Sequence, residues 1–513
     1  MKKSFTPYQS KEEKAIVIGG GIAGLLTARV LSKHYEEVII VERDELPQES
    51  STRSGTPQAF HPHRVLTRGS MIMERFFPGY IDDLLNQGAP STQNKKGSVF
   101  TSQGRIQMVH LEKNVSSSRA LLEWTFRQRV QKISNVHFLS KKEVTGLQIS
   151  DDYKQVKGVH IRERSEQKQK QEQTVSADLV VDTSGRSSKL LKWFESMKFE
   201  VPQPERLKVS LGYSTRYYRV PPHVREKWGA VVSEAQPAKG IGAGMIEYIE
   251  DNMAQTLLFS AGGAHYPSTN PEEYEKELEL TSPMIGEIVK ELEPIGVPRG
   301  YRISESVRQH FEQMEDWPAG LLVVGDAFCN FDPIHGQGMT VAAIEAEMLD
   351  ICLHEKQHTS QPHFERYVLQ RMQEAIEPAW WLSSVADLRW EGIEHTGAEP
   401  LKGVSFAQKY FNLYLKQAVK LANEENNTSM FLKYFMMNAL VLSPRDIINA
   451  RTLNMLLSGD GSLEKQQLVD ELGNVDEQQI QERLDELIPS FSLEVDEKVL
   501  QSFSSMFPSN TKV

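Results

Sequence analysis

Cysteine is almost absent from this sequence, since only Cys329 and Cys352 occur among 513 residues. Two cysteines cannot build the disulfide framework of a small secreted protein. Neither stands in a CxxC motif of the kind that indicates redox or zinc chemistry. This cysteine usage suits a reducing compartment, and we predict a cytoplasmic protein.

Long apolar runs are also missing. Met1 to Lys14 is polar and charged, without the apolar core of a secretory signal. The longest apolar tract, Met430 to Ser443, is interrupted by Lys433 and is shorter than the ~20 residues that span a bilayer. The sequence therefore predicts no transmembrane segment. The tract is predicted to form a buried or interfacial helix, which leaves peripheral membrane contact open.

The chain lacks a large basic stripe, and its formal net charge is -11. Nucleic-acid binding needs clustered Lys and Arg, so no nucleic-acid partner is predicted. His61 and His63 are two potential metal ligands without a third, so no metal site is predicted. The length predicts two or three folded units with a sizeable core.

A glycine-rich turn near the start is what the sequence does contain. Gly19, Gly21 and Gly24 follow the apolar run Ala15 to Ile18 and precede the helical stretch Leu25 to Ser32. In this GxGxxG pattern the first glycine permits a tight turn, the second lets a pyrophosphate approach, and the third lets helix and strand pack closely. The helix N-terminus offers free N–H groups to the anion. The pattern predicts a dinucleotide-binding βαβ unit.

An acidic residue ends the next apolar strand. Val38 to Val41 is followed by Glu42, 23 residues after Gly19, and then by Arg43. A carboxylate at this spacing accepts hydrogen bonds from a ribose diol. It would repel the 2′-phosphate of NADP, so the pocket favours FAD or NAD.

A second strand and turn lie far along the chain. Gly320 to Val324 is predicted as a buried strand, and the turn at its carboxyl end carries Asp326. The loop Pro333 to Met339 then leads into a helix that begins near Gly338. This order places Asp326 beside the crevice outside the strand ends, with positive helix dipole charge nearby.

Two further segments fit the same site. Ala177 to Val181 is predicted as a strand, and it ends at Asp182 to Arg186. Ser118 opens a helix whose next residue is Arg119. A guanidinium suits a phosphate geometrically, although Arg119 also fits a plain surface position on a helix.

These motifs together resemble the group A FAD-dependent monooxygenase superfamily. The stretches from Val41 to Asp44, from Gly55 to His63 and from Trp317 to Met339 are most similar to bacterial flavin epoxidases and hydroxylases of polyketide, polyether and terpenoid biosynthesis. The resemblance covers residues 12 to 460. It implies an α/β fold with an FAD-binding Rossmann-like domain of the glutathione-reductase type, an inserted mixed β-sheet substrate domain and a helical C-terminal region. The family's Asp-Gly element departs here to Asp182-Thr183-Ser184-Gly185.

The resemblance also implies domain boundaries. The FAD-binding domain is expected in two parts, residues 12–200 and 302–355. A mixed-sheet substrate domain is expected over 201–301, and a helical region over 356–513. The polar run Glu163 to Gln173 is predicted as a hairpin loop.

The implied site residues fall into two groups. Those expected to bind the cofactor are Gly19, Gly21, Gly24, Glu42, Arg43, Arg119, Asp182, Asp326 as the ribityl ligand, Pro333, Gly336, Gly338 and Met339. Those expected near the reacting atoms are His335, Arg53 and His61. Each histidine also admits the interpretation of a plain loop residue.

The implied activity is that of a monooxygenase. NAD(P)H or a separate flavin reductase would reduce FAD, O2 would form a C4a-hydroperoxyflavin, and one oxygen would epoxidise or hydroxylate a largely apolar secondary metabolite such as a polyene or aromatic. One alternative is a flavin-dependent reductase or dehydrogenase of an isoprenoid-like substrate. Another is a flavin halogenase, although the WxWxIP element of those enzymes is absent. A third is a non-catalytic binding protein of the prenyl-protein chaperone kind.

Overall fold

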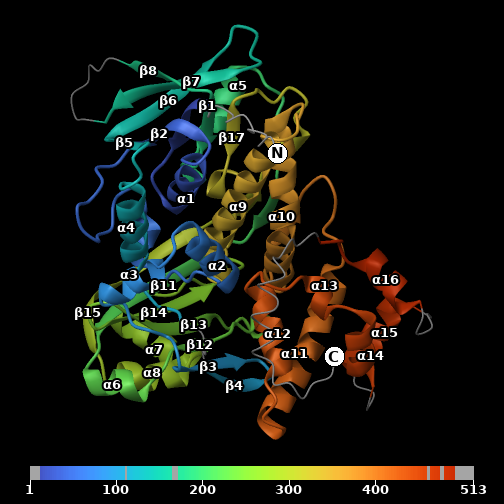
Figure 1. Cartoon of the computed structure of the whole chain (residues 1–513). Coiled ribbons are helices and arrows are strands. Elements are labelled where there is room, and N and C mark those ends of the chain that lie inside the picture. The colour runs from blue at the N-terminus through green and yellow to red at the C-terminus, as the bar shows by residue number, and fades with distance from the viewer. Residues whose placement is uncertain (1–11, 110–112, 165–171, 459–462, 474–478, 492–513) are drawn as a thin grey trace, which may run out of the picture.

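The structure is a computed structural model of the whole chain. It describes residues 12–109, 113–164, 172–458, 463–473 and 479–491. Figure 1 shows an upper part around a parallel sheet, a lower part around a mixed sheet, and a helical C-terminal part beside the lower one. The sequence predicts an α/β fold with a parallel-sheet FAD-binding region, a mixed sheet and a helical C-terminal region. This prediction is confirmed.

A five-stranded parallel sheet forms the upper part. Its apolar strands are almost fully buried, as expected for a parallel sheet covered on both faces. The order is β17(Leu321–Val323), β9(Leu179–Asp182), β1(Glu12–Ile18), β2(Tyr35–Glu42), β5(Val136–Ser140). Strands remote in sequence therefore end at one edge of the sheet.

A seven-stranded mixed sheet forms the lower part. Its order is β15(Glu293–Ile303), β11(Leu211–Arg219), β14(Met253–Ser260), β13(Ala243–Ile249), β12(Val231–Ser233), β3(Lys96–Thr101), β4(Gly104–Val109). The last two strands come from residues within the predicted range 12–200, and they join this sheet through the parallel pair of β12 and β3.

Two small sheets complete the strands. One has the order β18(Cys329–Asn330), β16(Ser306–Arg308), β10(Glu205–Lys208), β19(Glu394–Thr396). The other is β6(Lys142–Ile149), β7(Val156–Glu163), β8(Gln173–Ser176). The predicted loop from Glu163 to Gln173 lies between β7 and β8, and its residues 165–171 fall outside the described residues.

The helices pack around these sheets and make up most of the C-terminal part (Figure 1). Those of the first 300 residues are α1(Ile22–Leu31), α2(Thr67–Phe76), α3(Tyr80–Asn86), α4(Arg119–Val130), α5(Leu190–Ser196), α6(Pro222–Lys227), α7(Pro271–Thr281) and α8(Pro283–Val289). The later ones are α9(Gly338–Lys356), α10(Phe364–Asp387), α11(Val404–Glu424), α12(Ser429–Asn438), α13(Pro444–Ile447), α14(Ala450–Leu457), α15(Leu463–Leu472) and α16(Ile480–Leu487).

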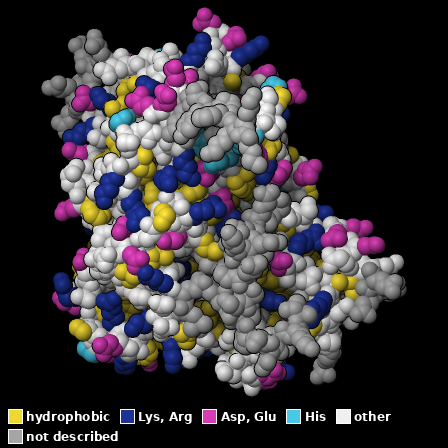
Figure 2. Space-filling view, in the orientation of Figure 1, with side chains coloured by type: hydrophobic (Ala, Val, Ile, Leu, Met, Phe, Trp, Pro, Cys, Tyr) yellow, Lys and Arg dark blue, Asp and Glu magenta, His cyan; other side chains and the backbone are white. Residues whose placement is uncertain are grey.

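The apolar tract Met430 to Ser443 contains α12, whose Phe431 and Met437 are buried. Among the described residues, no helix combines the length and apolar character that crossing a bilayer requires. The predicted lack of a secretory signal concerns Met1 to Lys14, of which residues 1–11 lie outside the described part. Lys and Arg side chains are mixed with Asp and Glu on the face drawn in Figure 2.

Candidate functional site

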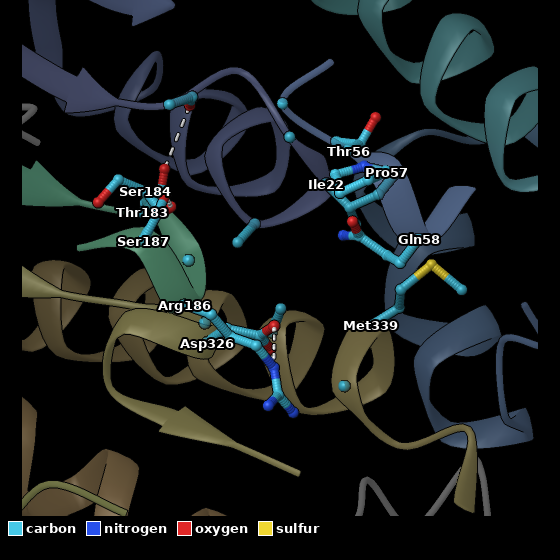
Figure 3. Close-up of a pocket in the computed structure, with 18 of the residues that line it drawn as sticks. Ile22, Thr56, Pro57, Gln58, Thr183, Ser184, Arg186, Ser187, Asp326 and Met339 are labelled. Atoms are coloured by element: carbon cyan, nitrogen blue, oxygen red, sulfur yellow. Dashed lines mark hydrogen bonds and ion pairs between the residues drawn. The ribbon is translucent and has the colours of Figure 1, made fainter. Parts of the chain in front are cut away.

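Three remote segments meet at the carboxyl edge of the parallel sheet. Ile18 at the end of β1 and Val323 at the end of β17 both pair with Asp182 of β9. The turns that follow these strands line one cavity. Figure 3 shows Thr183 and Ser184 facing Thr56, Pro57 and Gln58 across it. The edge is where open α/β sheets bind their ligands.

The glycine-rich turn has the geometry that its pattern predicts. Gly19 has a φ of +104°, and a Cβ there would lie 2.9 Å from the carbonyl oxygen of Thr183. A Cβ on Gly24 would lie 1.9 Å from the carbonyl oxygen of Gly19, so helix and turn touch. At Gly21, by contrast, the nearest atom is Arg53 Nη2 at 3.9 Å. Gly21 is the N-cap of α1 and no side chain caps it, so free N–H groups face the cavity there.

Glu42 lies beside this turn, and it lines the cavity. Its side chain is buried, with Oε2 accepting from the Gly20 N–H at 2.7 Å and Oε1 from the Asp44 N–H at 2.9 Å. The adjacent Arg43 is exposed and lines the cavity as well. Both residues therefore lie at the cavity wall, and their role in cofactor binding stays a prediction.

Arg53 is surrounded by carboxylates. Its Nη1 lies 3.2 Å from Glu42 Oε1 and 2.9 Å from Asp44 Oδ2, and its Nε donates to Glu123 Oε1 at 2.8 Å. Although burial works against the charged form, these carboxylates raise the pKa of Arg53. The structure therefore places Arg53 in an ion-pair network next to the first turn. Its expected place near the reacting atoms stays a prediction.

Arg119 joins the same network from α4. Its Nη1 lies 2.9 Å from Glu123 Oε2, one helical turn away, and its side chain is buried and lines the cavity. A buried guanidinium at a cavity wall is a suitable partner for a phosphate.

Asp326 lies in the short turn after β17 and lines the cavity. Its carboxylate is 38% exposed, and Oδ2 lies 3.7 Å from Arg186 Nε (Figure 3). Removal from bulk water raises the pKa of Asp326, while the charges of Arg186 and Arg119 oppose the rise. Its carboxylate is therefore open to hydroxyl donors from a bound sugar alcohol.

Asp182 has a different environment. It is buried, and it accepts from the Ser184 N–H at 2.9 Å, from Ser184 Oγ at 2.6 Å and from Ser188 Oγ at 2.6 Å. Burial raises the pKa of Asp182, and these hydrogen bonds partly offset that rise. The side chain orders the turn that carries Arg186, and Asp182 does not belong to the cavity lining.

The segment Pro333 to Met339, called the flavin loop below, borders the cavity opposite the first turn. Pro333, Gly336, Gly338 and Met339 all line it. Helix α9 begins at Gly338 as predicted, and no side chain caps its N-terminus. A Cβ at Gly338 would lie only 3.7 Å from Asp326 Oδ1. Two uncapped helix N-termini, those of α1 and α9, therefore face one cavity.

His335 is turned away from the cavity toward α10, and it is absent from the cavity lining. Its Nε2 lies 2.7 Å from Asp387 Oδ1, which is hydrogen-bond length. Burial alone would lower the pKa of His335, but the charge and hydrogen bond of Asp387, with the charge of Asp332, raise it to about 9. Burial and the Asp387 charge raise the pKa of Asp332 to about 7. The sequence predictions included neither aspartate: Asp387 is 52 residues from His335 with no motif linking the two, and Asp332 directly precedes the predicted loop Pro333 to Met339.

Potential metal ligands gather at two places in the described part of the chain. One is Asp332, His335 and Asp387, and the other is His34, Asp350 and His354. In the second cluster Lys33 Nζ already lies 3.2 Å from Asp350 Oδ2. In the first cluster His335 Nε2 and Asp387 Oδ1 are at hydrogen-bond distance, and in the second His34 Nε2 lies 3.3 Å from Asp350 Oδ1.

His61 forms part of the wall on the side of the seven-stranded sheet. Its Nδ1 lies 2.9 Å from Thr215 Oγ1, and its ring meets Tyr213 edge to face at 4.5 Å. Burial, with the charges of His63 and Arg299, lowers the pKa of His61 to about 3. His61 is therefore a neutral imidazole over the working pH range.

The rest of this wall is apolar and aromatic, and sequence reasoning did not find it. The wall consists of Tyr213, Leu257, Tyr301, Ile303 and Phe331. Strands β11, β14 and β15 supply the first four, so their directions depend on a sheet register that the sequence does not reveal. The Tyr213 and Tyr301 rings lie 5.5 Å apart.

The residues present fit FAD. An open backbone position lies at Gly21 beside an uncapped helix, a carboxylate follows the second strand, and Asp326 stands some way along the same cavity. Donors for a pyrophosphate and acceptors for hydroxyl groups thus line one cavity, as the binding of a dinucleotide requires.

Comparison with known proteins agrees with this assignment. The family described as FAD dependent oxidoreductase matches residues 14–133. Among solved structures, the p-nitrophenol 4-monooxygenase PnpA of Pseudomonas putida DLL-E4 has a TM-score of 0.57 at 14% identity, covering 85% of this chain and 100% of that one. The flavin-dependent brominase Bmp2 has a TM-score of 0.56 at 14% identity, covering 83% and 93%. At such identities these structures share the fold.

One curated relative is closer in sequence. Protein Rv3254 of Mycobacterium tuberculosis (strain ATCC 25618 / H37Rv) is 30% identical over 398 residues, which are 76% of this chain and 82% of the relative. The chain therefore belongs to the same family as protein Rv3254, and it is an FAD-dependent oxidoreductase.

Proposed function

We propose that this protein is a monooxygenase that inserts oxygen into a largely apolar organic substrate. The observation that carries the proposal is the continuity of the cavity. One cavity is lined by the glycine-rich turn, by the flavin loop and by the aromatic wall of the seven-stranded sheet. An apolar compartment next to a flavin suits oxygen transfer, because water must be excluded from the reacting atoms.

Bound FAD supplies the redox chemistry, activating O2 after reduction by NAD(P)H or by a separate flavin reductase. The chain's own side chains bind and orient. Gly21, Glu42 and Arg119 are suited to hold the dinucleotide half, and Asp326 to hold the ribityl chain. Arg53 keeps Glu42 in place through the ion pair described above.

The aromatic wall is suited to orient the substrate. Burial, above all, raises the pKa of Tyr213, so its phenol stays protonated and can donate one hydrogen bond. The neutral His61 ring contacts the Tyr213 ring edge to face. Phe331 and Ile303 give the remaining surface its apolar character. We therefore propose a polyene or aromatic substrate with a single polar group, epoxidised or hydroxylated in secondary metabolism in the cytoplasm.

An isotope experiment tests this function. Purified protein with FAD is given NADH or NADPH under 18O2, together with a panel of apolar alkenes and phenols. We expect one 18O atom in a product and oxygen consumption that matches product formation. Flavin oxidation with hydrogen peroxide as the sole oxygen product across the whole panel would refute the proposal.

The competing functions are a flavin-dependent reductase or dehydrogenase of an isoprenoid-like substrate and a flavin halogenase. The halogenase is considered because the structure is similar to that of the brominase Bmp2. Adding bromide to the same reaction separates the three. A brominated product indicates a halogenase, and a saturated product without 18O indicates a reductase.

A further inference from the structure

One face of α10 contacts the flavin loop and its neighbours at three points. Trp380, Ser383 and Asp387 stand at positions i, i+3 and i+7, which share a helix face. All three side chains are buried. Figure 1 shows α10 extending from the neighbourhood of α9 down toward the C-terminal helices.

Each of the three meets a different partner. The Trp380 ring lies edge to face with Phe331 at 6.0 Å. Ser383 Oγ donates to Gln337 Oε1 at 2.6 Å, and Asp387 Oδ1 accepts from His335 Nε2 at 2.7 Å. The partners Phe331, His335 and Gln337 span the flavin loop from just before its start almost to the beginning of α9.

The flavin loop has few bonds of its own. The Asp332 side chain accepts from the Ile334 N–H at 2.9 Å, and the Gly336 N–H donates to the Pro333 carbonyl at 3.0 Å. Its middle residue Gly336 has a φ of +65°. The position of the loop is therefore determined largely by its contacts with α10.

We infer that α10 clamps the flavin loop in its FAD-binding position and that Asp387 is the positioning residue of this clamp. The residue acts through His335, whose neighbours Pro333 and Gly336 line the cavity. The His335 imidazole is hydrogen-bonded to Asp387 and lies within 4.8 Å of the Asp332 carboxylate, so its positive charge compensates the burial of both acids. The clamp bears on FAD binding, whichever reaction the bound flavin carries out.

The charged surroundings of the clamp come from four elements. Asp332 and His335 belong to the turn that begins the loop, and Asp387 belongs to α10. Arg186 faces Asp332 from the turn after β9 and donates to the Phe331 carbonyl, and Tyr213 faces Asp332 from β11. The nearby acid Asp326 acts on Cys329 and Glu345, whose pKa values its charge helps to raise, rather than on this cluster. Arg186 is the other cation close to the cluster among the described residues.

The test is the affinity of the apoprotein for FAD, measured by the quenching of flavin fluorescence, with no substrate present. We expect Asp387→Asn to weaken FAD binding about tenfold, because a charge-assisted hydrogen bond is lost. His335→Gln should weaken it to a similar extent. The double variant should be no weaker than either single one, because both remove the same interaction. The matched control is Glu374→Gln, which changes an exposed carboxylate on the same helix and should bind FAD normally.

A pH series separates positioning from mere folding. In the wild type, FAD binding should weaken as the pH rises from 7 through about 9, where His335 loses its proton. In Asp387→Asn that step should move to lower pH, since the partner that raises the pKa is neutral. Wild-type affinity in both single variants, or additive losses in the double variant, would overturn the inference. If Asp387→Asn does not fold, His335→Gln and its pH profile decide the question alone.

Discussion

At the scale of single residues, the two glycines that open α1 differ in what surrounds them. Gly24 has the Gly19 carbonyl directly beside its missing Cβ, whereas Gly21 has open cavity. One position serves packing and the other serves ligand approach. The difference can be tested with the same substitution at both sites.

Gly21→Ala should leave thermal stability nearly unchanged and weaken FAD binding strongly, because the new methyl group occupies the space of the pyrophosphate. Gly24→Ala should lower the melting temperature as well, because its Cβ would lie 1.9 Å from the Gly19 carbonyl oxygen. Melting curves and FAD titrations of both variants check this. Equal stability losses in the two variants would contradict the assignment of their roles.

Asp326 is the residue on which the ribityl assignment rests. Asp326→Ala should weaken FAD affinity by about ten- to a hundredfold, because hydrogen bonds to a charged group are lost. The flavin content of the purified protein and the Kd from fluorescence titration measure the effect. Asp316→Ala, an exposed aspartate before β17, is the control and should retain full flavin content.

How far a residue could be predicted depended on whether its motif was local. Gly19 directly follows β1, Glu42 ends β2 and Asp326 lies in the turn after β17, so strand order alone placed them at one edge. Asp387 is 52 residues from its partner His335 and carries no motif, so only the folded chain brings the two together. His335 was predicted near the reacting atoms from its place in the loop. Its side-chain direction depends on α10, which no local pattern reveals.

At the scale of helices and strands, the predictions were best for the parallel sheet. Continuous apolar runs and turn glycines identify buried strands and their ends. The mixed sheet was harder, because β3 and β4 reach it from the first part of the chain through a pairing with β12. Pairing between strands so far apart in sequence leaves no trace in composition. The start of α1 was also displaced, from the predicted Leu25 to Ile22.

The N-terminus of α4 links FAD binding to the mixed sheet. Ser118 Oγ accepts from the Leu121 N–H at 3.1 Å, and the Ser118 N–H donates to Glu250 Oε2 at 3.0 Å. Ser118→Ala should lower the free energy of unfolding by about 1 kcal/mol through loss of the cap. It should also weaken FAD binding, because the next residue is Arg119 at the cavity wall.

Asn270→Ala is the matched control for that variant. Asn270 caps α7 by accepting from the Glu272 and Glu273 N–H groups, and it does not line the cavity. Its loss should reduce stability by a similar ~1 kcal/mol without changing FAD affinity. Urea unfolding and FAD titration distinguish the two. If both variants bind FAD like the wild type, α4 does not position the guanidinium.

At the scale of the whole molecule, the pH range of stability is set by two pairs of histidines whose pKa values are shifted in opposite directions. Burial lowers the pKa of His61 to about 3 and, with the charge of Arg119, that of His63 to about 4. Burial also opposes protonation of His310 and His335, but their carboxylate partners raise both pKa values to about 9.

These shifts predict a stability maximum near pH 6.5. His61 and His63, whose pKa values are lowered, contribute stability at a pH above the unfolded-state pKa of about 6.5. This contribution is lost as the pH falls toward 3 to 4. His310 and His335, whose pKa values are raised, contribute stability at a pH below about 6.5. This contribution is lost as the pH rises through about 9. Melting temperatures from pH 4 to pH 10, with and without FAD, measure both limbs. His310→Gln should flatten the alkaline limb, and a profile that keeps rising beyond pH 8 would contradict this account.

The strand order has a consequence for how the protein is made. The edge strand β17 is synthesised about 140 residues after its neighbour β9, with most of the mixed sheet in between. At a synthesis rate of about 5–20 residues per second, the ribosome needs on the order of ten seconds to cover that gap. During that time β9 presents an unpaired backbone edge in the nascent chain. We therefore expect slower translation of the mixed-sheet segment to lower the yield of correctly folded enzyme, and a chaperone that covers the open edge of β9 to restore it.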